Sequence, residues 1–294
     1  MGEITKIAWC DHTFNPWIGC TKIGPGCDHC YAESQDSRER WEGKRHWGIG
    51  VPRYHTSASN WQLPLRWNKK AAKDRLPHRV FCASLADVFD NEAPNAWRDD
   101  LWTLIEATPN LLWLLVTKRI GNVKQFVWPA WIVEGFPSNV RLLITVCNQD
   151  EADRDIPKLL ALPCKNGISY EPALGSVDWS RWLSIRRSTG LSEWVKDGDR
   201  NDLHWVIIGG ESAQAGHRAR PFDLAWARET IAQCKAAGVP VFCKQLGSTA
   251  YEPATPYLNS KTMILAGRRL YFKDRAGSDP SEWPEELRVR QFPR

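Results

Sequence analysis

Residues 19–31, GCTKIGPGCDHCY, place Cys20, Cys27 and Cys30 in one short loop that is rich in glycine and proline. Thiolates are ligands for soft metal ions and iron–sulfur clusters, and a glycine-rich backbone lets several sulfur atoms converge on one centre. A structural zinc site uses four ligands, whereas a cubane cluster held by three cysteines keeps one iron free for a further ligand. Residues 31–41 have the composition of a polar helix. The pattern therefore predicts a metal-binding loop followed by a helix.

Short apolar runs alternate with helical patterns along the chain, which indicates repeated βα units and a parallel sheet. The clearest helix runs from Asp223 to Ala237, with Asp223 as its N-cap and Gly238 just past its end. Continuous apolar strands are buried on both faces, as in barrels and in doubly wound sheets, and periodicity alone does not choose between these two. The expected strands span residues 12–18, 79–84, 111–117, 140–146, 167–171, 204–208 and 239–244.

Polar residues and glycines follow six of these runs in succession, where each strand is expected to end. In either architecture the chemistry belongs at the carboxyl ends of the strands. For any single residue a turn or a helix cap is the more common explanation, but six successive strand ends of this kind favour a shared site. The residues are Ser84 and Asp87; Thr117, Lys118 and Arg119; Thr145, Cys147 and Asn148; Glu171; Gly209, Gly210 and Glu211; and Lys244 and Gln245.

The bulk composition is that of an ordinary globular protein with an unusual number of tryptophans. The 294 residues include 17 tryptophans and nine cysteines, and the formal net charge is +5. A mildly basic chain is compatible with a nucleic-acid partner without requiring one. No stretch approaches the length of a membrane span, and the N-terminus has no apolar run. The cysteine content without a signal peptide leads us to expect a cytoplasmic protein with no membrane partner.

The cysteine loop resembles that of radical SAM enzymes, which hold a 4Fe-4S cluster through three cysteines and bind S-adenosylmethionine at the fourth iron. The usual spacing in that superfamily is three residues and then two, whereas six and then two separate the cysteines here. Three further segments are similar to a narrower, phage-associated radical SAM family of unknown function: IGGES at 208–212, ARP at 219–221 and FCKQLG at 242–247. The resemblance covers about residues 7 to 247, and it favours an incomplete (β/α) barrel of about six to seven parallel strands.

The resemblance also implies roles for individual residues. Cys20, Cys27 and Cys30 would bind the cluster, whose electron cleaves S-adenosylmethionine to a 5′-deoxyadenosyl radical that takes a hydrogen atom from the substrate. Carried over by strand position, the cofactor would meet Ser84 and Asp87 at its amino group, Lys118 at its carboxylate, Thr145 and Asn148 at the ribose, and Gly209 and Gly210 near the adenine. His29 stands where the superfamily usually has an aromatic ring beside the adenine, and Tyr31 and Glu171 are the remaining residues expected at the cofactor.

Three residues are expected on the substrate side of the site, namely Cys147, Glu211 and Lys244. Related sequences tend to carry glutamate at the position of Cys147. A thiol there could return a hydrogen atom to a product radical, or it could be an inert replacement. The role of Glu211 is open between the cofactor and the substrate.

Two inserts and a tail depart from the regular alternation of strands and helices. Residues 43–78 interleave basic and aromatic side chains, which suits either a nucleic-acid surface or a solvated crossover with tryptophans packed on the barrel. Residues 172–203 form a long crossover of the kind that serves as a lid or a binding loop. We expect a barrel domain at 1–247 and a small appendage at 248–294, with a hairpin formed by 263–265 and 269–272. If this segment binds DNA, we expect phosphate contacts from Arg45, Arg53, Arg66, Lys69 and Lys70, and contact with a sugar or a base from Trp47, Tyr54 or Trp61.

Taken with the phage association of the resembled family, these features predict a monomeric isomerase or lyase that rearranges an amino-acid adduct on a thymine of phage DNA. It would work in the host cytoplasm if phage-encoded, with an external electron donor such as flavodoxin. Two alternatives stay open. One is a radical SAM enzyme that acts on a peptide or a small molecule. The other is a non-catalytic zinc-binding nucleic-acid module that uses the three cysteines with His12 or His29.

Overall fold

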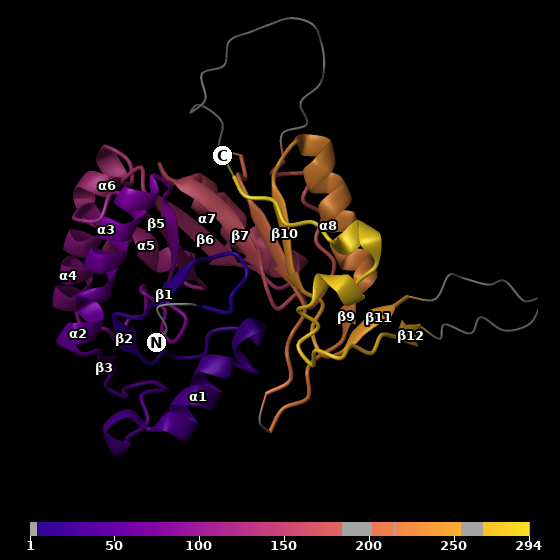
Figure 1. The fold of residues 1–294 in the computed structure, drawn as a ribbon, viewed down its shortest axis with the longest axis horizontal. Coiled ribbons are helices and arrows are strands. Elements are labelled where there is room, and N and C mark those ends of the chain that lie inside the picture. Colours follow the sequence, from indigo (N-terminus) through magenta and orange to yellow (C-terminus); the bar gives the residue numbers. More distant parts are fainter. Residues whose placement is uncertain (1–4, 184–201, 215, 254–266, 294) are drawn as a thin grey trace, which may run out of the picture. The chain divides into compact units, whose positions relative to one another are not determined.

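The computed structural model describes residues 5–183, 202–214, 216–253 and 267–293, which form an α/β fold (Figure 1). Seven strands form one sheet in the order β1-β4-β5-β6-β7-β8-β10, as expected for an incomplete (β/α) barrel. By its internal contacts the chain divides into a first unit, residues 1–145 with 157–167, and a second unit, residues 146–156 with 168–294. The predicted boundary between residues 247 and 248 remains a prediction.

All seven predicted strands are present, with ends that differ from the prediction by at most a few residues. The stretch at 12–18 is divided into β1 and the short β2 by Asn15 and Pro16. The sheet strands are β1 (His12–Phe14), β4 (His78–Cys82), β5 (Leu111–Thr117), β6 (Val140–Thr145), β7 (Lys165–Tyr170), β8 (Val206–Gly209) and β10 (Val241–Gln245).

In the first unit, β1, β4, β5 and β6 pair in parallel, and their side chains are largely buried. The helices α3 (Leu63–Asp74) and α4 (Asn95–Glu106) lie beside this part of the sheet (Figure 1). Leu101, Trp102 and Ile105 form the buried face of α4, at the spacing of one helical stripe. The parallel pairing sets the register of the strands and so the relative positions of their carboxyl ends. The remaining elements of the unit are β2 (Trp17–Ile18), α1 (Tyr31–Glu39), β3 (Tyr54–His55), α2 (Ala58–Trp61), α5 (Val123–Phe126) and α6 (Pro129–Val133).

In the second unit, β8 pairs in parallel with β7 and with β10, and α8 (Leu224–Ala237) follows the predicted helix closely. The Asp223 carboxylate accepts a hydrogen bond from the amide of Ala225 (2.8 Å), and Gly238 ends the helix with a φ of 70°. Both caps were predicted from residue type, since carboxylates cap helix N-termini and glycine adopts the left-handed conformation readily. The long helix α7 (Gln149–Leu160) contributes residues to both units.

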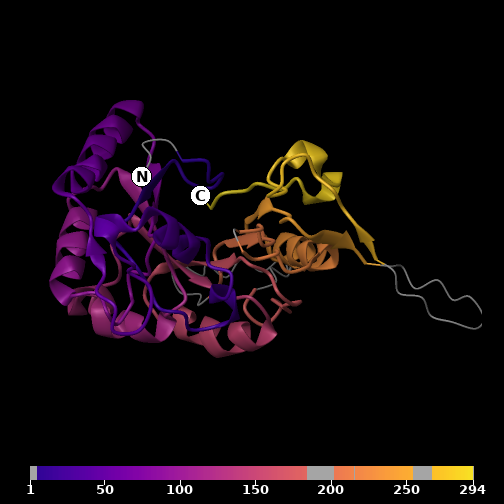
Figure 2. The same cartoon turned by 90° about the horizontal axis from the view of Figure 1, so that it is seen from below.

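The C-terminal segment runs beside α8 in both views (Figures 1 and 2), and Arg228 of α8 forms ion pairs with Glu252 and Glu286. The predicted hairpin is only partly testable, because residues 263–265 lie outside the described residues. The described arm forms a strand at β12 (Arg268–Arg269), which pairs antiparallel with β11 (Ala250–Glu252). A parallel pairing of β11 with β9 (Phe222–Asp223) completes this small sheet, which the sequence did not predict. Among the described residues, no helix combines the length and apolar character needed to cross a membrane.

Candidate functional site

The cysteine loop begins at the end of β2 with Gly19, whose φ of +113° favours glycine. A Cβ atom at this position would lie 2.2 Å from the carbonyl oxygen of His46, so a side chain there is excluded by space as well. The loop then places Cys27 at the end of a short 3-10 helix (Pro25–Cys27) and Cys30 at the N-cap of α1. The predicted loop followed by a polar helix is therefore confirmed.

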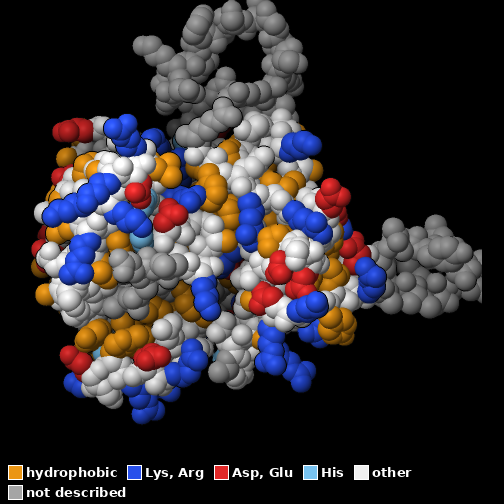
Figure 3. All heavy atoms as spheres, viewed as in Figure 1, with side chains coloured by type: hydrophobic (Ala, Val, Ile, Leu, Met, Phe, Trp, Pro, Cys, Tyr) orange, Lys and Arg blue, Asp and Glu red, His pale blue; other side chains and the backbone are white. Residues whose placement is uncertain are grey.

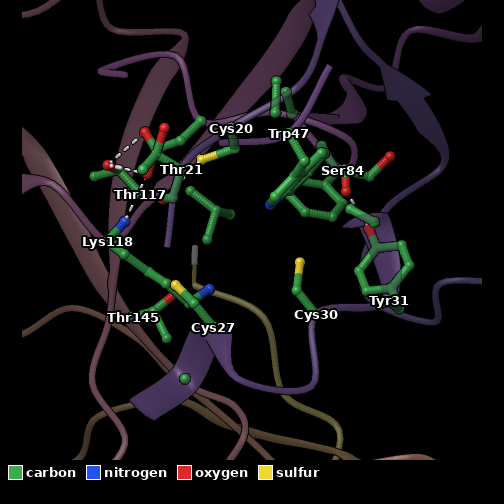
Figure 4. Close-up of a pocket in the computed structure, with 17 residues that line it drawn as sticks. Cys20, Thr21, Cys27, Cys30, Tyr31, Trp47, Ser84, Thr117, Lys118 and Thr145 are labelled. Atoms are coloured by element: carbon green, nitrogen blue, oxygen red, sulfur yellow. Dashed lines mark hydrogen bonds between the residues drawn. The ribbon is translucent and has the colours of Figure 1, made fainter. Parts of the chain in front are cut away.

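Cys20, Cys27 and Cys30 line one pocket of about 110 Å³ in the first unit. Figure 4 shows the three cysteines at different sides of this pocket, two from the loop and one from the start of α1. Trp47 and Tyr31 form part of the wall, and the remaining lining residues come mostly from the carboxyl ends of β4, β5 and β6. These include four predicted cofactor contacts and one threonine at the end of β5: Ser84, Asp87, Thr117, Lys118 and Thr145. The convergence of strand ends and cysteine loop was predicted from the chain order of these residues.

The number and type of the ligand side chains indicate which kind of metal centre the loop could bind. Among the described residues, no three His, Cys, Asp or Glu side chains stand close enough together to hold one metal ion. A cubane cluster bonds each thiolate to a different iron, so its cysteines stand further apart than the ligands of a single ion. His12, a proposed fourth ligand for zinc, instead stacks on Trp67 with ring centroids 4.3 Å apart. Three cysteine thiols that line one pocket are the type of donor that such a cluster uses.

The thiols of Cys20 and Cys30 lie in surroundings of different polarity. Burial, reinforced by the Asp87 carboxylate, raises the pKa of Cys20 to about 12 although Arg119 acts against it. Burial also raises the pKa of Cys30, and it is opposed by the backbone N–H groups of Glu33 and Ala32 and by the Lys118 ammonium. Amides at a helix N-terminus and a nearby cation favour thiolate. Since metal ligands must be deprotonated, binding of a metal centre at these residues would release protons.

Asp87 lines the pocket, but its carboxylate is occupied by the protein itself. It accepts hydrogen bonds from the Thr117 hydroxyl (2.8 Å) and from the backbone N–H groups of Lys118 and Phe89 (both 3.0 Å). Two of these interactions appear as dashed lines in Figure 4. A buried carboxylate that receives several hydrogen bonds is satisfied without a ligand. The geometry therefore gives Asp87 the role of fixing the ends of β4 and β5, and its predicted contact with an amino group remains untested.

Ser84 and Tyr31 meet across the pocket wall, where the Tyr31 hydroxyl donates to the Ser84 carbonyl oxygen (Figure 4). The Ser84 hydroxyl accepts from the Asn15 side-chain amide at 3.0 Å, so Asn15 also supports this wall. His29 is half-buried and is not one of the residues that line the pocket. Asn15 carried no sequence signal beyond its place between β1 and β2.

Sequence reasoning missed a buried ion-pair network next to the cysteines. Arg53, proposed as a phosphate contact, is instead buried: it donates to Asp90 at 2.6 Å and to the carbonyl oxygens of His46, Gly48 and Val51. Its Nη2 also donates to the Thr21 hydroxyl at 2.7 Å, so it fixes residues 46–51 against the cysteine loop. The prediction for Arg53 is wrong because this side chain satisfies internal carbonyls and a carboxylate. From sequence alone an arginine is expected to be exposed, and no local pattern indicated that Asp90 would be the ion-pair partner of Arg53.

The predicted residues of the second unit lie at strand ends but are bound to one another. Glu171, after β7, forms an ion pair with Lys244 of β10. Glu211 accepts two hydrogen bonds from the guanidinium of Arg220, at 2.6 Å from Nη2 and 3.1 Å from Nε. The Gln245 side-chain amide donates to the Gly210 carbonyl oxygen at 2.8 Å. These strand-end groups therefore form an internal network.

Gly209 and Gly210 were expected to allow a close approach of the cofactor, but the groups that approach them in the structure belong to other residues of this chain. A Cβ atom at Gly210 would lie 2.4 Å from the Leu246 carbonyl oxygen, and one at Gly209 would lie 3.2 Å from the Glu171 side chain. Cys147 is almost fully buried, and its amide donates to the Glu151 carboxylate at 2.8 Å. Asn148 accepts from the amide of Glu151 at 3.0 Å, which is a helix-capping contact at the start of α7. A ribose contact at Asn148 and a substrate contact at Cys147 remain predictions.

Fold and site together define an α/β protein with a pocket lined by three cysteines at the carboxyl ends of parallel strands. The chain belongs to the family described as Protein of unknown function (DUF5131), whose model matches residues 4–275. No curated protein matches it.

Solved structures of spore photoproduct lyase show a distant likeness to this chain. One variant matches at 12% identity and a TM-score of 0.45, over 92% of this chain and 71% of its own. A second variant, with bound AdoMet and dinucleoside spore photoproduct, matches at 13% identity and a TM-score of 0.43, over 90% of this chain and 69% of its own. A third structure, a complex with dinucleoside spore photoproduct, matches at 12% identity and a TM-score of 0.39, over 91% of this chain and 68% of its own. These likenesses are too distant to assign a function.

Proposed function

We propose that this protein is a radical SAM enzyme in which Cys20, Cys27 and Cys30 hold a 4Fe-4S cluster. The observation that carries the proposal is that three cysteines of one glycine- and proline-rich loop line a single pocket at the carboxyl ends of the strands. When bound, the cluster supplies the electron that cleaves S-adenosylmethionine to a 5′-deoxyadenosyl radical. The electron would come from an external donor such as flavodoxin.

The residues around the thiols have the chemistry to bind and orient a zwitterionic sulfonium compound. Lys118 extends from the end of β5 and provides a cation for a carboxylate, and the Thr145 hydroxyl can donate to a sugar oxygen. The indole of Trp47 provides an apolar wall that excludes water from the pocket. Its place is fixed because Arg53 binds the carbonyl oxygens on either side of it, those of His46 and Gly48.

Lys118 gives the sharpest test of cofactor binding that spares the cluster. In Lys118→Met we expect the affinity for S-adenosylmethionine to fall at least tenfold at unchanged iron content, because a charge-assisted contact is removed. Lys124→Met is the matched control, since Lys124 is an exposed lysine of the same unit that does not line the pocket. Calorimetry on the anaerobically reconstituted protein measures both affinities, and 5′-deoxyadenosine formation with dithionite measures cleavage. Equal affinity for S-adenosylmethionine in the two variants would show that Lys118 does not bind this cofactor.

For the substrate we propose a modified base in DNA, with rearrangement of an amino-acid adduct on thymine as the reaction. The exposed residues Lys44 and Arg45 support this, because they directly precede the segment that carries Trp47 to the pocket. A base inside a duplex must be extruded before a radical can reach it. On the face shown in Figure 3, Lys and Arg side chains are scattered among other side chains, so any DNA contact there would use dispersed charges.

The position of each basic residue in the fold supports a division of the lysines and arginines of the 43–78 segment into two groups. Helix α3 ends at Asp74, and β4 begins at His78, so the lysines in the last turns of α3 lie toward the amino end of β4. The pocket is lined by residues beyond the carboxyl end of the same strand. Lys69 and Lys70 are therefore poorly placed to bind a substrate at the pocket, whereas Lys44 and Arg45 remain candidates.

Salt dependence of DNA binding distinguishes the two groups. Replacing Lys44 and Arg45 by glutamine should reduce the slope of log affinity against log salt by about two, because about one unit is lost with each phosphate contact. The double variant Lys69→Gln with Lys70→Gln is the matched control and should leave the slope unchanged. An unaltered slope in the first variant would contradict the DNA proposal. Equal turnover of a free nucleoside, or turnover of a peptide in place of DNA, would favour the small-molecule or peptide alternative.

A further inference from the structure

Arg119 is a buried cation in direct contact with the first cysteine of the loop. It follows β5 by two residues, and only about 7% of its side chain is exposed. Its Nη2 donates to the Thr21 carbonyl oxygen at 2.6 Å and lies 3.7 Å from the Cys20 sulfur, within hydrogen-bond reach of a thiol. Its Nε has no hydrogen-bond partner among the described residues. A buried guanidinium with an unused donor has capacity for a further acceptor.

The carboxylates near Arg119 are mainly bound to other groups, so the guanidinium could be neutralised further by an additional anion. The nearest carboxylate is that of Asp90, 3.5 Å away, and Asp90 is held more closely by Arg53 at 2.6 Å. Asp87 is the other nearby carboxylate, but its oxygens accept from Thr117 and from two backbone amides. Two buried arginines thus share Asp90 as their close ion-pair partner in the described residues. Buried cations are stable only when anions compensate them, and a neutral thiol at Cys20 supplies no charge.

We propose that Arg119 is a positioning residue for the cluster, and that it donates a charge-assisted hydrogen bond to the Cys20 thiolate. The inference rests on the proposed function, since it assigns a donor to one of the three thiolates that would bind iron. Hydrogen bonds to ligating sulfurs are one of the means by which proteins set the reduction potential of iron–sulfur clusters. Reduction adds one electron from an external reductant and no proton, so the cluster becomes more negative. A fixed cation at Cys20 stabilises that more negative state.

The test is the reduction potential of the cluster in Arg119→Gln, measured by a redox titration monitored by electron paramagnetic resonance. At a solution potential that reduces half of the wild-type clusters, we expect the ratio of reduced to oxidised cluster to fall about tenfold, equivalent to about 59 mV for one electron. Arg119→Lys, which keeps the charge and loses the planar donor group, should shift the ratio less. Arg79→Gln is the matched control: Arg79 also pairs with an aspartate, Asp11, but it lies near the amino end of β4.

A second variant with the opposite expected sign protects the test against loss of folding in Arg119→Gln. Asp90→Asn leaves Arg119 less neutralised, so the ratio of reduced to oxidised cluster should rise above that of the wild type. The inference is overturned if Arg119→Gln binds a full cluster with the potential of the Arg79→Gln control. It is also overturned if Asp90→Asn shifts the ratio downward or leaves it unchanged. If the wild-type protein forms no cluster, the proposed function fails, and that result is distinguishable from a failure of this inference.

Discussion

Both units of this protein carry polar residues at strand ends that bind one another, and in the first unit these residues also line a pocket. In the first unit, three thiols face a pocket, and a neighbouring arginine keeps a donor without a partner in the described residues. In the second unit, Glu171 binds Lys244, Glu211 binds Arg220, and Gln245 binds the backbone of Gly210. A polar residue at a strand end is therefore weak evidence for a ligand site. Evidence for such a site comes from groups that the protein itself leaves without partners.

The largest expected contrast is in stability. Arg220→Ala should lower the free energy of unfolding by about 3 kcal/mol, because it leaves the buried Glu211 carboxylate without its bidentate partner. Arg218→Ala should change it by less than about 0.5 kcal/mol, since Arg218 is exposed. Urea unfolding of the metal-free protein measures both values. Equal effects of the two substitutions would show that the ion pair between Arg220 and Glu211 does not stabilise the fold.

The same measurement sharpens the comparison within the first unit. Thr117→Val should lower the free energy of unfolding by about 2 kcal/mol, since it removes a hydroxyl donor from the buried Asp87 carboxylate. In the metal-free protein Cys27→Ala should cost less than this, because among the described residues no hydrogen bond or ion pair involves its thiol, and only packing is lost. If Cys27→Ala proved the more damaging of the two, the thiols would have a structural role in the absence of metal.

The smallest expected effect is a dependence of stability on alkaline pH. Burial raises the pKa of Cys20 to about 12, above its ordinary value of 9.0. A folded-state pKa above the unfolded value means that the stabilisation is complete below pH 9 and is lost as the pH rises toward 12. Between pH 8 and pH 10, the metal-free wild type should therefore lose roughly 1 kcal/mol more than Cys20→Ala. Anaerobic urea titrations at the two pH values provide the measurement, and parallel losses would contradict the assigned environment of Cys20.

The sequence predicted those features that depend on local chemistry. The run Leu111–Thr117 is apolar and bounded by turn residues, and it forms β5 with the predicted ends. Helix α8 begins and ends at its predicted caps because carboxylate and glycine each act within a turn of their own position. The cysteine loop and the strand-end residues of the first unit were placed together correctly because successive parallel strands present their carboxyl ends to one edge.

What the sequence did not predict depends on contacts between distant residues. Arg53 and Arg119 share Asp90, and no periodicity links positions 37 and 29 residues apart in the chain. Charged residues are assigned to the surface by default, so two buried arginines appeared as candidates for a ligand or for DNA. The small sheet of β9, β11 and β12 escaped prediction for a similar reason, since its partners include a parallel pairing of short strands remote in sequence.

The central claim is that the three thiols of the loop hold a 4Fe-4S cluster, and its composition can be measured directly. Iron and acid-labile sulfide should be determined per chain after anaerobic reconstitution of the wild type, Cys27→Ala and Cys10→Ala. Cys10 is the matched control, because it is a buried cysteine of the same unit outside the pocket. We predict about four iron and four sulfide in the wild type and in Cys10→Ala, and almost none in Cys27→Ala. Full iron loading in Cys27→Ala, or a wild type that takes up zinc without sulfide, would contradict the account.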